Sequence, residues 1–427
     1  MHATASSDAP RSRFQAFSAL RHRDYRYYWF GMLSAVMGLQ ILWVGQAWLV
    51  YDMTRSPLYL GLVGFAQAVP TILLTMFGGV IADRVDRRRL LLLTQSLNAI
   101  IVLWLAILLA LGWIEVWHLL LAAFLAGAIG AFDQPARMAF TPQLIPREEL
   151  VNAIALQQMI WQGTRIIGPA IGGVLISTIG IQSCFFITAA AVGGMVLCIA
   201  MVRAKHIPAE RAEGKHMGHD FMEGIAFIRG QSVVAALIGL TFFNSLFGMS
   251  HQVLLPIFAR EVYEVGSDGY GLLMGIAGVG AFFSSMLIAS MGNYRHKGAM
   301  LLLGAVAFGV SLVVFALSHS FMLSLVIMLV SGFVNSLYMT TASASVQMIV
   351  PNDLRGRVMG VYSLTWSLLP LGGMVMGGMA ALTDAPTAVA LGGAVVAGMA
   401  LLVGFGVREV RTLGARIETR DPRLATA

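Results

Sequence analysis

Long apolar runs separated by short polar segments restrict the fold of this chain more than any other feature. Hydrophobic residues make up 58% of the 427 residues and charged residues only 11%, whereas a soluble domain carries about 25% charged residues. A helix needs about 20 consecutive apolar residues to cross a bilayer. Runs of this length predict twelve membrane-spanning helices in an all-α polytopic membrane protein, at 28–51, 59–82, 90–111, 118–138, 157–178, 183–203, 233–256, 270–292, 299–318, 321–343, 357–381 and 388–407.

The basic residues indicate how these spans are oriented. Among the 28 lysines and arginines, only Arg55 and Arg260 fall in odd-numbered loops, and only Arg165 falls well inside a span. Because Lys and Arg concentrate in cytoplasmic loops, both termini are predicted to be cytoplasmic in a multi-pass protein of the cell inner membrane. The same rule explains the net charge of +7, so we expect a lipid bilayer rather than nucleic acid as partner.

The two halves of the chain resemble each other. Three features of the first half recur in the same order in the second half. They are Asp83 with Asn293, Pro146 with Pro351, and Pro169 with Pro370. Such a repeat predicts two pseudo-symmetric six-helix bundles around a shared cavity. The predicted units are a cytoplasmic tail 1–24, an N-terminal bundle 25–203, a cytoplasmic linker 204–231 with an amphipathic helix, a C-terminal bundle 232–408 and a cytoplasmic tail 409–427.

The stretch Gly78–Arg89 contains the most specific motif, G-G-V-I-A-D-R-V-D-R-R-R. Its arginines resist entry into the membrane, so it predicts a short cytoplasmic loop between spans two and three. The pattern resembles the loop between helices 2 and 3 of major facilitator superfamily transporters, with an ordinary arginine-rich loop as the alternative. The resemblance implies the major facilitator fold and a latch between helices 2 and 11 in the outward-facing state, formed by Gly79, Asp83, Arg84, Arg87 and Arg88.

Three further segments extend the resemblance over most of the chain, from about residue 20 to residue 408. They are Phe132–Pro146, Arg165–Gly173 and Val350–Gly360. Together they resemble the branch of the superfamily that contains the enterobactin exporter and macrolide or drug efflux proteins. The resemblance makes Arg137, Arg355 and Arg357 candidate latch partners of Asp83.

Span five contains a Gly-Pro segment that resembles the antiporter motif of the superfamily. Proline removes a backbone hydrogen bond and bends a helix, while glycines permit close contact with a neighbouring helix. The chain departs from the motif at Thr164, where a small residue is usual. We expect a helix-five pivot, with simple packing as the alternative, at Gly168, Pro169, Gly172 and Gly173.

Few ionisable residues fall within the predicted spans, where charge is costly and usually functional. Asp133 lies one helical turn before Arg137, so the two can pair, and Arg165 in the next span can also approach Asp133. Asp133 is either part of a structural ion pair at the cytoplasmic rim or a group that exchanges protons. His251 in span seven titrates in a suitable range, so Asp133, Arg165 and His251 are the proton-coupling candidates.

Uncharged polar and aromatic residues are more frequent in the spans. The family resemblance implies that spans one, four, seven and ten line the cavity. Amides and aromatic rings suit a large amphipathic solute, although such a residue taken alone more often serves helix packing than ligand contact. The candidates for substrate contact are Gln40, Trp43, Asn244, Phe247, Asn335 and Tyr338.

No motif indicates an enzyme. The sequence has no Walker loop for ATP, no metal-ligand spacing and no serine elbow, so we expect no metal and no cofactor. The resemblance and the Gly-Pro pivot favour a monomer that exports a small amphipathic compound of the drug or siderophore class. Exchange for protons by alternating access is the expected mechanism. Two alternatives stay open: an uptake symporter of the same fold, and a transporter-like sensor or assembly subunit that moves nothing.

Overall fold

The structure is a computed structural model that describes residues 15–203, 217–291, 296–411 and 413. Predictions that involve Asn293, the segment 204–216 or the outer parts of the two tails lie outside these residues, and so does the side chain of Asp83. The described residues form helices and contain no strand. The predicted all-α class is therefore confirmed.

Six long helices build the N-terminal bundle. They are α1 (Arg23–Thr54), α2 (Pro57–Arg84), α3 (Arg87–Ala110), α4 (Val116–Phe140), α5 (Leu150–Thr178) and α6 (Gln182–Met201). Short 3₁₀ turns lie at Gln15–Arg21, Thr141–Gln143 and Arg147–Glu149. The motif loop is short because Asp86 begins α3 as its N-cap and accepts hydrogen bonds from the backbone N–H of Arg88 and Arg89, at 2.9 and 3.2 Å.

The C-terminal bundle repeats this arrangement with two interrupted helices. Its α-helices are α8 (Ser232–Phe243), α9 (Leu255–Ile257), α10 (Gly266–Met291), α11 (Lys297–Leu317), α12 (Phe321–Ile349), α13 (Asn352–Ser367), α14 (Leu369–Leu382), α15 (Ala385–Gly406) and α16 (Arg408–Arg411). The seventh span continues from α8 through π-helical, 3₁₀ and π-helical turns at Asn244–Gly248, Met249–Leu254 and Phe258–Val262. The eleventh span is divided at Leu368, just before Pro370.

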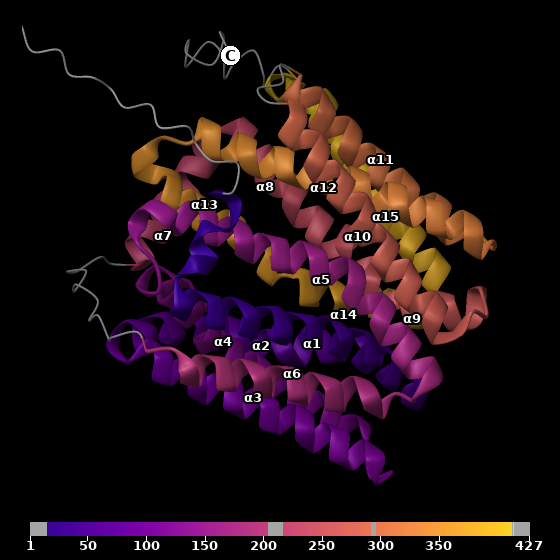
Figure 1. Cartoon of the computed structure of the whole chain (residues 1–427). Coiled ribbons are helices and arrows are strands. Elements are labelled where there is room, and N and C mark those ends of the chain that lie inside the picture. Colours follow the sequence, from indigo (N-terminus) through magenta and orange to yellow (C-terminus); the bar gives the residue numbers. More distant parts are fainter. Residues whose placement is uncertain (1–14, 204–216, 292–295, 412, 414–427) are drawn as a thin grey trace, which may run out of the picture.

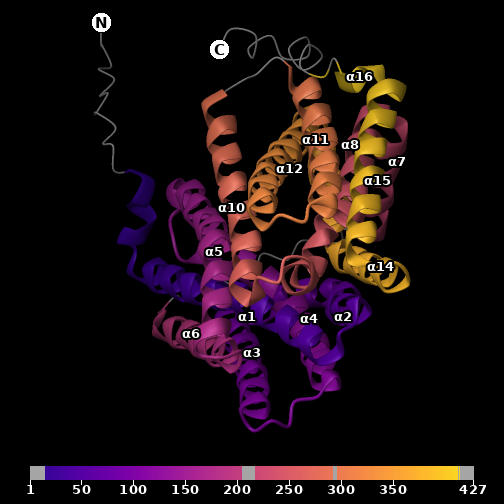
Figure 2. The same cartoon turned by 90° about the vertical axis from the view of Figure 1, so that its right-hand side faces the viewer.

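The two ends of the bundles are named here by the chain path. The near side is where α1 begins and α15 ends, and the far side is where α1 ends and α15 begins. In Figure 1 the helices of the orange and yellow C-terminal bundle are inclined to those of the indigo and magenta N-terminal bundle. Figure 2, seen from the far side, shows the N-terminal bundle below the C-terminal bundle.

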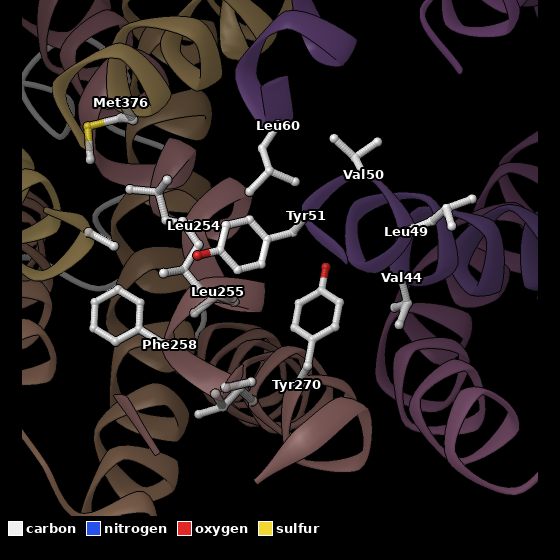
Figure 3. Close-up of a cluster of buried hydrophobic side chains, with 14 of the residues drawn as sticks. Val44, Leu49, Val50, Tyr51, Leu60, Leu254, Leu255, Phe258, Tyr270 and Met376 are labelled. Carbon is white, nitrogen blue, oxygen red and sulfur yellow. The ribbon is translucent and has the colours of Figure 1, made fainter. Parts of the chain in front are cut away.

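Buried apolar residues form three clusters, and their distribution explains this inclination. The far-side core contains residues of both bundles, among them Val44, Tyr51, Leu254, Phe258 and Met376 (Figure 3). On the near side each bundle has a core of its own, one around Tyr28 and Phe140 and one around Leu301 and Tyr338. The bundles are therefore joined on the far side and separate on the near side.

The outer surface of the bundles is apolar, with exposed side chains such as Leu73, Phe77, Ile100, Leu303 and Phe405. An apolar surface of this extent indicates contact with lipid. Eleven stretches of the described chain are long and apolar enough to cross a membrane. Helix α5, which corresponds to the predicted span 157–178, does not meet this criterion although it is 29 residues long.

Helix α7 (Met217–Gly230) forms within the predicted linker and packs against α8 and α13. Glu223 of α7 forms an ion pair of 2.5 Å with Arg357 of α13. Phe227 and Ile228 pack against the near-side core of the C-terminal bundle. The apolar residues of the predicted amphipathic helix thus hold α7 against the C-terminal bundle.

Candidate substrate cavity

Three adjoining chambers lie along the boundary between the bundles. The interface chamber, of about 380 Å³, is lined by residues of both bundles, including Gln40, Trp43 and Arg165 on one side and His251 and Trp366 on the other. The C-terminal chamber, of about 590 Å³, shares Arg165, His251 and Trp366 with it. The N-terminal chamber, of about 300 Å³, shares Trp43 and Trp161 with it. We call the three together the central cavity; each chamber has the size of a small-molecule site.

Helix α5 presents a polar stripe to this cavity. Gln158, Gln162 and Arg165 follow each other at helical spacing and all line the C-terminal chamber. Trp161 lies beside them in the interface chamber. These residues lower the apolar content of α5, which explains why the helix does not meet the criterion for a membrane span even though it crosses the bundle like its neighbours.

The irregular middle of the seventh span forms part of the opposite wall. His251 lies in its 3₁₀ turn, and its Nδ1 forms a hydrogen bond of 2.6 Å with the carbonyl oxygen of Gly248. Gln252 follows it on the cavity wall. A membrane helix can contain π-helical or 3₁₀ turns where it lines a cavity, and such turns often occur at functional sites.

A buried network surrounds Asp133 in the N-terminal chamber. The carboxylate pairs with Arg137 of the same helix, as the spacing predicts. It also accepts hydrogen bonds from Thr94 Oγ1, at 2.8 Å, and from Gln95 Nε2, at 2.7 Å. The carboxylate thus contacts three donors, from Arg137, Thr94 and Gln95. This geometry fits a structural ion pair, one of the two roles that the sequence leaves open.

Arg165 has no such partner. Its half-buried side chain lines both the interface chamber and the C-terminal chamber. Among the residues that the structure describes, no hydrogen bond or ion pair involves the Arg165 guanidinium, and Asp133, its expected neighbour, is engaged by Arg137. The cavity wall therefore carries one cationic group that no side chain neutralises.

The predicted substrate contacts divide into two groups. Gln40 and Trp43 lie on the wall of the interface chamber, and Asn335 lies on the wall of the C-terminal chamber. Asn244 is fully buried, and its Nδ2 donates to Asn335 Oδ1 at 3.2 Å. Phe247 packs against the far-side core and Tyr338 within the near-side core of the C-terminal bundle, so neither lines the three chambers.

Several wall residues did not emerge from the sequence. They are Gln158, Trp161, Gln162, Tyr362 and Trp366. For α5 a signal exists, because three polar residues at helical spacing in an otherwise apolar run indicate a face that does not contact lipid. Tyr362 and Trp366 carry no comparable signal, since aromatic residues are equally common on the lipid-facing side.

The predicted pivot residues lie where the bundles meet. A Cβ atom at Gly168 would come within 2.4 Å of Gln40 Cβ, and one at Gly173 within 2.5 Å of the carbonyl oxygen of Ser267 on α10. A Cβ atom added at Gly172 would come within 3.1 Å of Val44 Cβ on α1. Helix α5 continues through Pro169 without interruption. The pivot segment thus packs against α1 of its own bundle and α10 of the other.

The second half contains the matching contact. Helix α14 packs against α2. A Cβ atom added at Gly61 would come within 2.6 Å of the carbonyl oxygen of Gly373, and one added at Gly377 within 2.6 Å of that of Pro57. The paired helices α5 with α10 and α14 with α2 occupy equivalent places in the two halves, as the correspondence of Pro169 and Pro370 predicts. Backbone contact without intervening side chains therefore joins the bundles at two symmetric places.

Polar contacts close the far side above the shared apolar core. Asp52 of α1 pairs with Arg260 of the seventh span, and the Tyr51 hydroxyl donates to the Glu261 carboxylate. The Arg260 guanidinium lies 5.5 Å from the ring centre of Trp48. All of these contacts connect one bundle to the other.

The near-side arginines bind within one bundle or to the linker. Arg87 donates to the carbonyl oxygen of Ala139 at 3.2 Å, and Arg88 donates to the last carbonyls of α6 at 3.1 and 2.6 Å. Arg357 pairs with the linker residue Glu223. Arg84 and Arg355 are exposed, and Gly79 is half-buried.

Comparison with known proteins gives the class and the family. The fold resembles a bacterial homologue of the lysosomal transporter Spinster, with a TM-score of 0.67 and 16% identity over 96% of this chain and 99% of that one. It also resembles the nucleoside transporter NupG, with a TM-score of 0.68 and 14% identity over 92% and 98%. The protein is a multi-pass transporter of the major facilitator superfamily and not an enzyme. It belongs to the transmembrane secretion effector family, whose model matches residues 14–425.

Curated relatives share about a quarter of their residues with this chain. The staphyloferrin A transporter of Staphylococcus aureus is 27% identical over 78% of this chain and 84% of its own. The multidrug efflux pump Tap of Mycolicibacterium fortuitum is 27% identical over 82% and 88%. The enterobactin exporter EntS of Escherichia coli is 23% identical over 90% and 91%. These relatives agree with the branch that the sequence motifs indicate.

Proposed function

We propose that the protein exports a small amphipathic solute from the cytoplasm in exchange for protons, by alternating access. The observation that carries this proposal is the asymmetry of the bundle interface. The central cavity lies between two bundles that share one apolar core on the far side and have separate cores on the near side. A solute can therefore reach the cavity from the near side while the far side is closed.

The distribution of arginines supports a cytoplasmic near side. The near side carries Arg84 and Arg87–Arg89 at the motif loop, Arg203 after α6 and Arg355 near the start of α13. The far side carries Arg55 and Arg260. Positive charge concentrates on the cytoplasmic side of membrane proteins. On this basis the described conformation is open to the cytoplasm and ready to take up a solute for export.

The names of two relatives support the direction of transport. One is named a multidrug efflux pump and another an enterobactin exporter. Drug-like and siderophore-like solutes differ widely in structure, which agrees with a cavity lined by amides and indoles rather than by a dense set of charges.

Proton coupling is assigned to titratable groups on the cavity wall. His251 and Asp133 face the cavity from opposite bundles. Either group would meet the cytoplasm in the present state and the outside in the alternate one. The geometry of Asp133, with three donors, favours His251 as the group that exchanges the proton.

The remaining predicted sites are proposed to act during the conformational change. The glycines of α5 and their counterparts on α14 form narrow contacts about which the bundles rock. The latch of Gly79, Asp83 and the near-side arginines, with Arg137, Arg355 and Arg357 as partners, is proposed to form when the near side closes. In the described state Arg87 and Arg88 donate to backbone carbonyls of the N-terminal bundle, and Arg357 pairs with Glu223 of the linker.

The experiment is an accumulation assay in an efflux-deficient bacterial host that expresses the chain, with ethidium and a fluorescent siderophore analogue as probes. An exporter lowers accumulation, and a protonophore abolishes the difference. Higher accumulation would indicate an uptake symporter instead. No change with either probe, together with co-purification of a partner protein, would indicate a sensor or assembly subunit.

A further inference from the structure

Arg165 is placed where a transported solute would touch it. It projects from the polar stripe of α5 at the junction of the interface and C-terminal chambers, and the two chambers share it. The other residues that both chambers share include Gln162, His251 and Gln252. Any solute that occupies both chambers must pass this cluster.

The charge of Arg165 is not balanced by the protein. Among the described residues on the walls of the three chambers, Asp133 is the one carboxylate, and Arg137 pairs with it. The ion pair contributes no net charge, so the guanidinium of Arg165 gives the cavity a positive charge. A charge inside a membrane protein is costly unless a partner or water meets it. The chain provides no side-chain partner in the described residues, which leaves that place to the solute.

The groups around Arg165 complement the remainder of a solute. Gln162 and Gln252 offer amide donors and acceptors on the walls of the same two chambers. The indoles of Trp43, Trp161 and Trp366 provide flat apolar surface in the interface chamber. This combination recognises a molecule with an acidic group attached to an apolar or aromatic body.

We propose that Arg165 is the specificity-determining residue for an anionic group of the solute, so that the protein selects carboxylate-bearing or similarly acidic amphipathic compounds over cations of the same size. Arg fits this role because its planar guanidinium can donate two parallel hydrogen bonds to a carboxylate. The proposal deepens the proposed function and rests on it only for the direction of transport, since binding itself needs no direction.

The test compares two xanthene dyes of similar size and opposite charge, the anion 5-carboxyfluorescein and the cation rhodamine 123. Binding of each dye to the purified full-length chain in detergent is measured by fluorescence anisotropy. Wild type is expected to bind carboxyfluorescein at least about tenfold more tightly than rhodamine 123. The loss of one charge-assisted hydrogen-bonded contact reduces affinity about tenfold or more, so R165Q should abolish the preference, and R165K should retain part of it.

Two further variants keep the test decisive. R229Q removes an exposed arginine of α7 that lies away from the cavity, and it should leave both affinities unchanged. Q162E places a carboxylate one helical turn before Arg165, where it can neutralise the guanidinium without removing it. Q162E should therefore lower carboxyfluorescein affinity as R165Q does, even if R165Q folds poorly.

Several results would overturn the proposal. These are equal affinities of wild type for the two dyes, a preference for rhodamine 123, the absence of carboxyfluorescein binding, and an unchanged preference in R165Q and Q162E. The anisotropy measurement requires no proton gradient. If the protein binds carboxyfluorescein in preference to rhodamine 123 but does not change dye accumulation in cells, export is refuted and the anion site is retained. Proton-dependent export without the preference would refute the anion site alone.

Discussion

Asp83 is the acidic residue of the latch that the family resemblance implies. Replacement by asparagine removes the charge and keeps the shape of the side chain. We expect D83N to reach the membrane at wild-type abundance and to lose about 90% or more of its efflux, because a latch that relies on a charge-assisted contact would lose it. Dye efflux and immunodetection in the same cells provide the measurement.

The same motif offers a matched control for Asp83. Asp86 lies three residues later and caps α3 through its side chain. Asparagine caps a helix about as well as aspartate, so D86N should retain efflux. If D83N and D86N behaved alike, the special role of Asp83 would be lost.

The Asp133 network gives a prediction on stability. D133N would leave the buried Arg137 without its counter-charge, a change that costs about 3–5 kcal/mol when a buried pair is broken. The expected outcome is a lower melting temperature and lower abundance for D133N. Replacing both partners, in D133N/R137Q, should recover most of the stability, because no uncompensated charge remains.

Thermal unfolding of the three proteins, followed by intrinsic fluorescence, measures this effect. Efflux by the double variant that still responds to a protonophore would assign Asp133 a structural role. A stable double variant whose efflux is indifferent to the gradient would instead identify Asp133 as the proton carrier, contrary to our expectation.

The contact between α5 and α10 gives a prediction for a pair of helices. A Cβ atom at Gly271 would come within 2.5 Å of the carbonyl oxygen of Pro169, so G271A must push the helices apart. Overpacking of this kind costs about 1–3 kcal/mol. We expect G271A to destabilise the far-side closure and to reduce efflux several-fold.

Gly163 is the control for Gly271. It lies on α5 with nothing within 4 Å of its Cβ position, so G163A should leave efflux and melting temperature unchanged or slightly raise the latter, since alanine favours helix. If G271A and G163A showed equal efflux, the close approach of α5 and α10 would not be needed for transport.

The sequence predicts the positions of most helices, but it does not predict where a helix is irregular. Hydropathy locates the spans because lipid contact requires apolar residues whatever the packing inside. It does not reveal the π-helical and 3₁₀ turns of the seventh span, whose geometry depends on contacts with α14 and α15 that are far away in the chain. It also gives no reason for α5 to continue unbroken through Pro169, where packing against α1 and α10 supports the helix.

The cavity residues were predictable to the extent that polarity is rare in a membrane span. Gln40, Arg165, His251 and Asn335 stand out for that reason, and all four lie on the cavity wall. Asn244 stands out equally, but it is buried inside the bundle, where its Nδ2 donates to Asn335. Which polar residue faces the cavity depends on helix rotation, which a single sequence does not specify.

For the whole molecule, the proposed alternating access makes the polar contacts of the far side part of the balance between two conformations. Asp52 and Arg260 are partly exposed, so their pair contributes at most about 1 kcal/mol. Charge reversal in D52R or R260D replaces attraction by repulsion and disfavours the state open to the cytoplasm. The apparent KM for the cytoplasmic solute should rise by up to about fivefold in each variant.

The double variant D52R/R260D restores opposite charges in exchanged positions. We expect it to return the KM close to that of wild type, as measured by dye transport in everted membrane vesicles. Single variants with an unchanged KM, or a double variant no better than either one, would show that this pair does not contribute to closure.

The far-side core has a thermodynamic consequence. If the bundles rock as proposed, residues such as Tyr51, Leu254 and Phe258 leave apolar surroundings and meet water once in every cycle. Hydration of apolar surface raises the heat capacity, by about 0.45 cal/K/mol for each Å². The enthalpy of opening then varies with temperature, so a van 't Hoff plot of solute affinity should be curved, and a straight line would contradict the participation of this core. A transporter built in this way is tuned to a temperature range by the size of the apolar surface that it must wet.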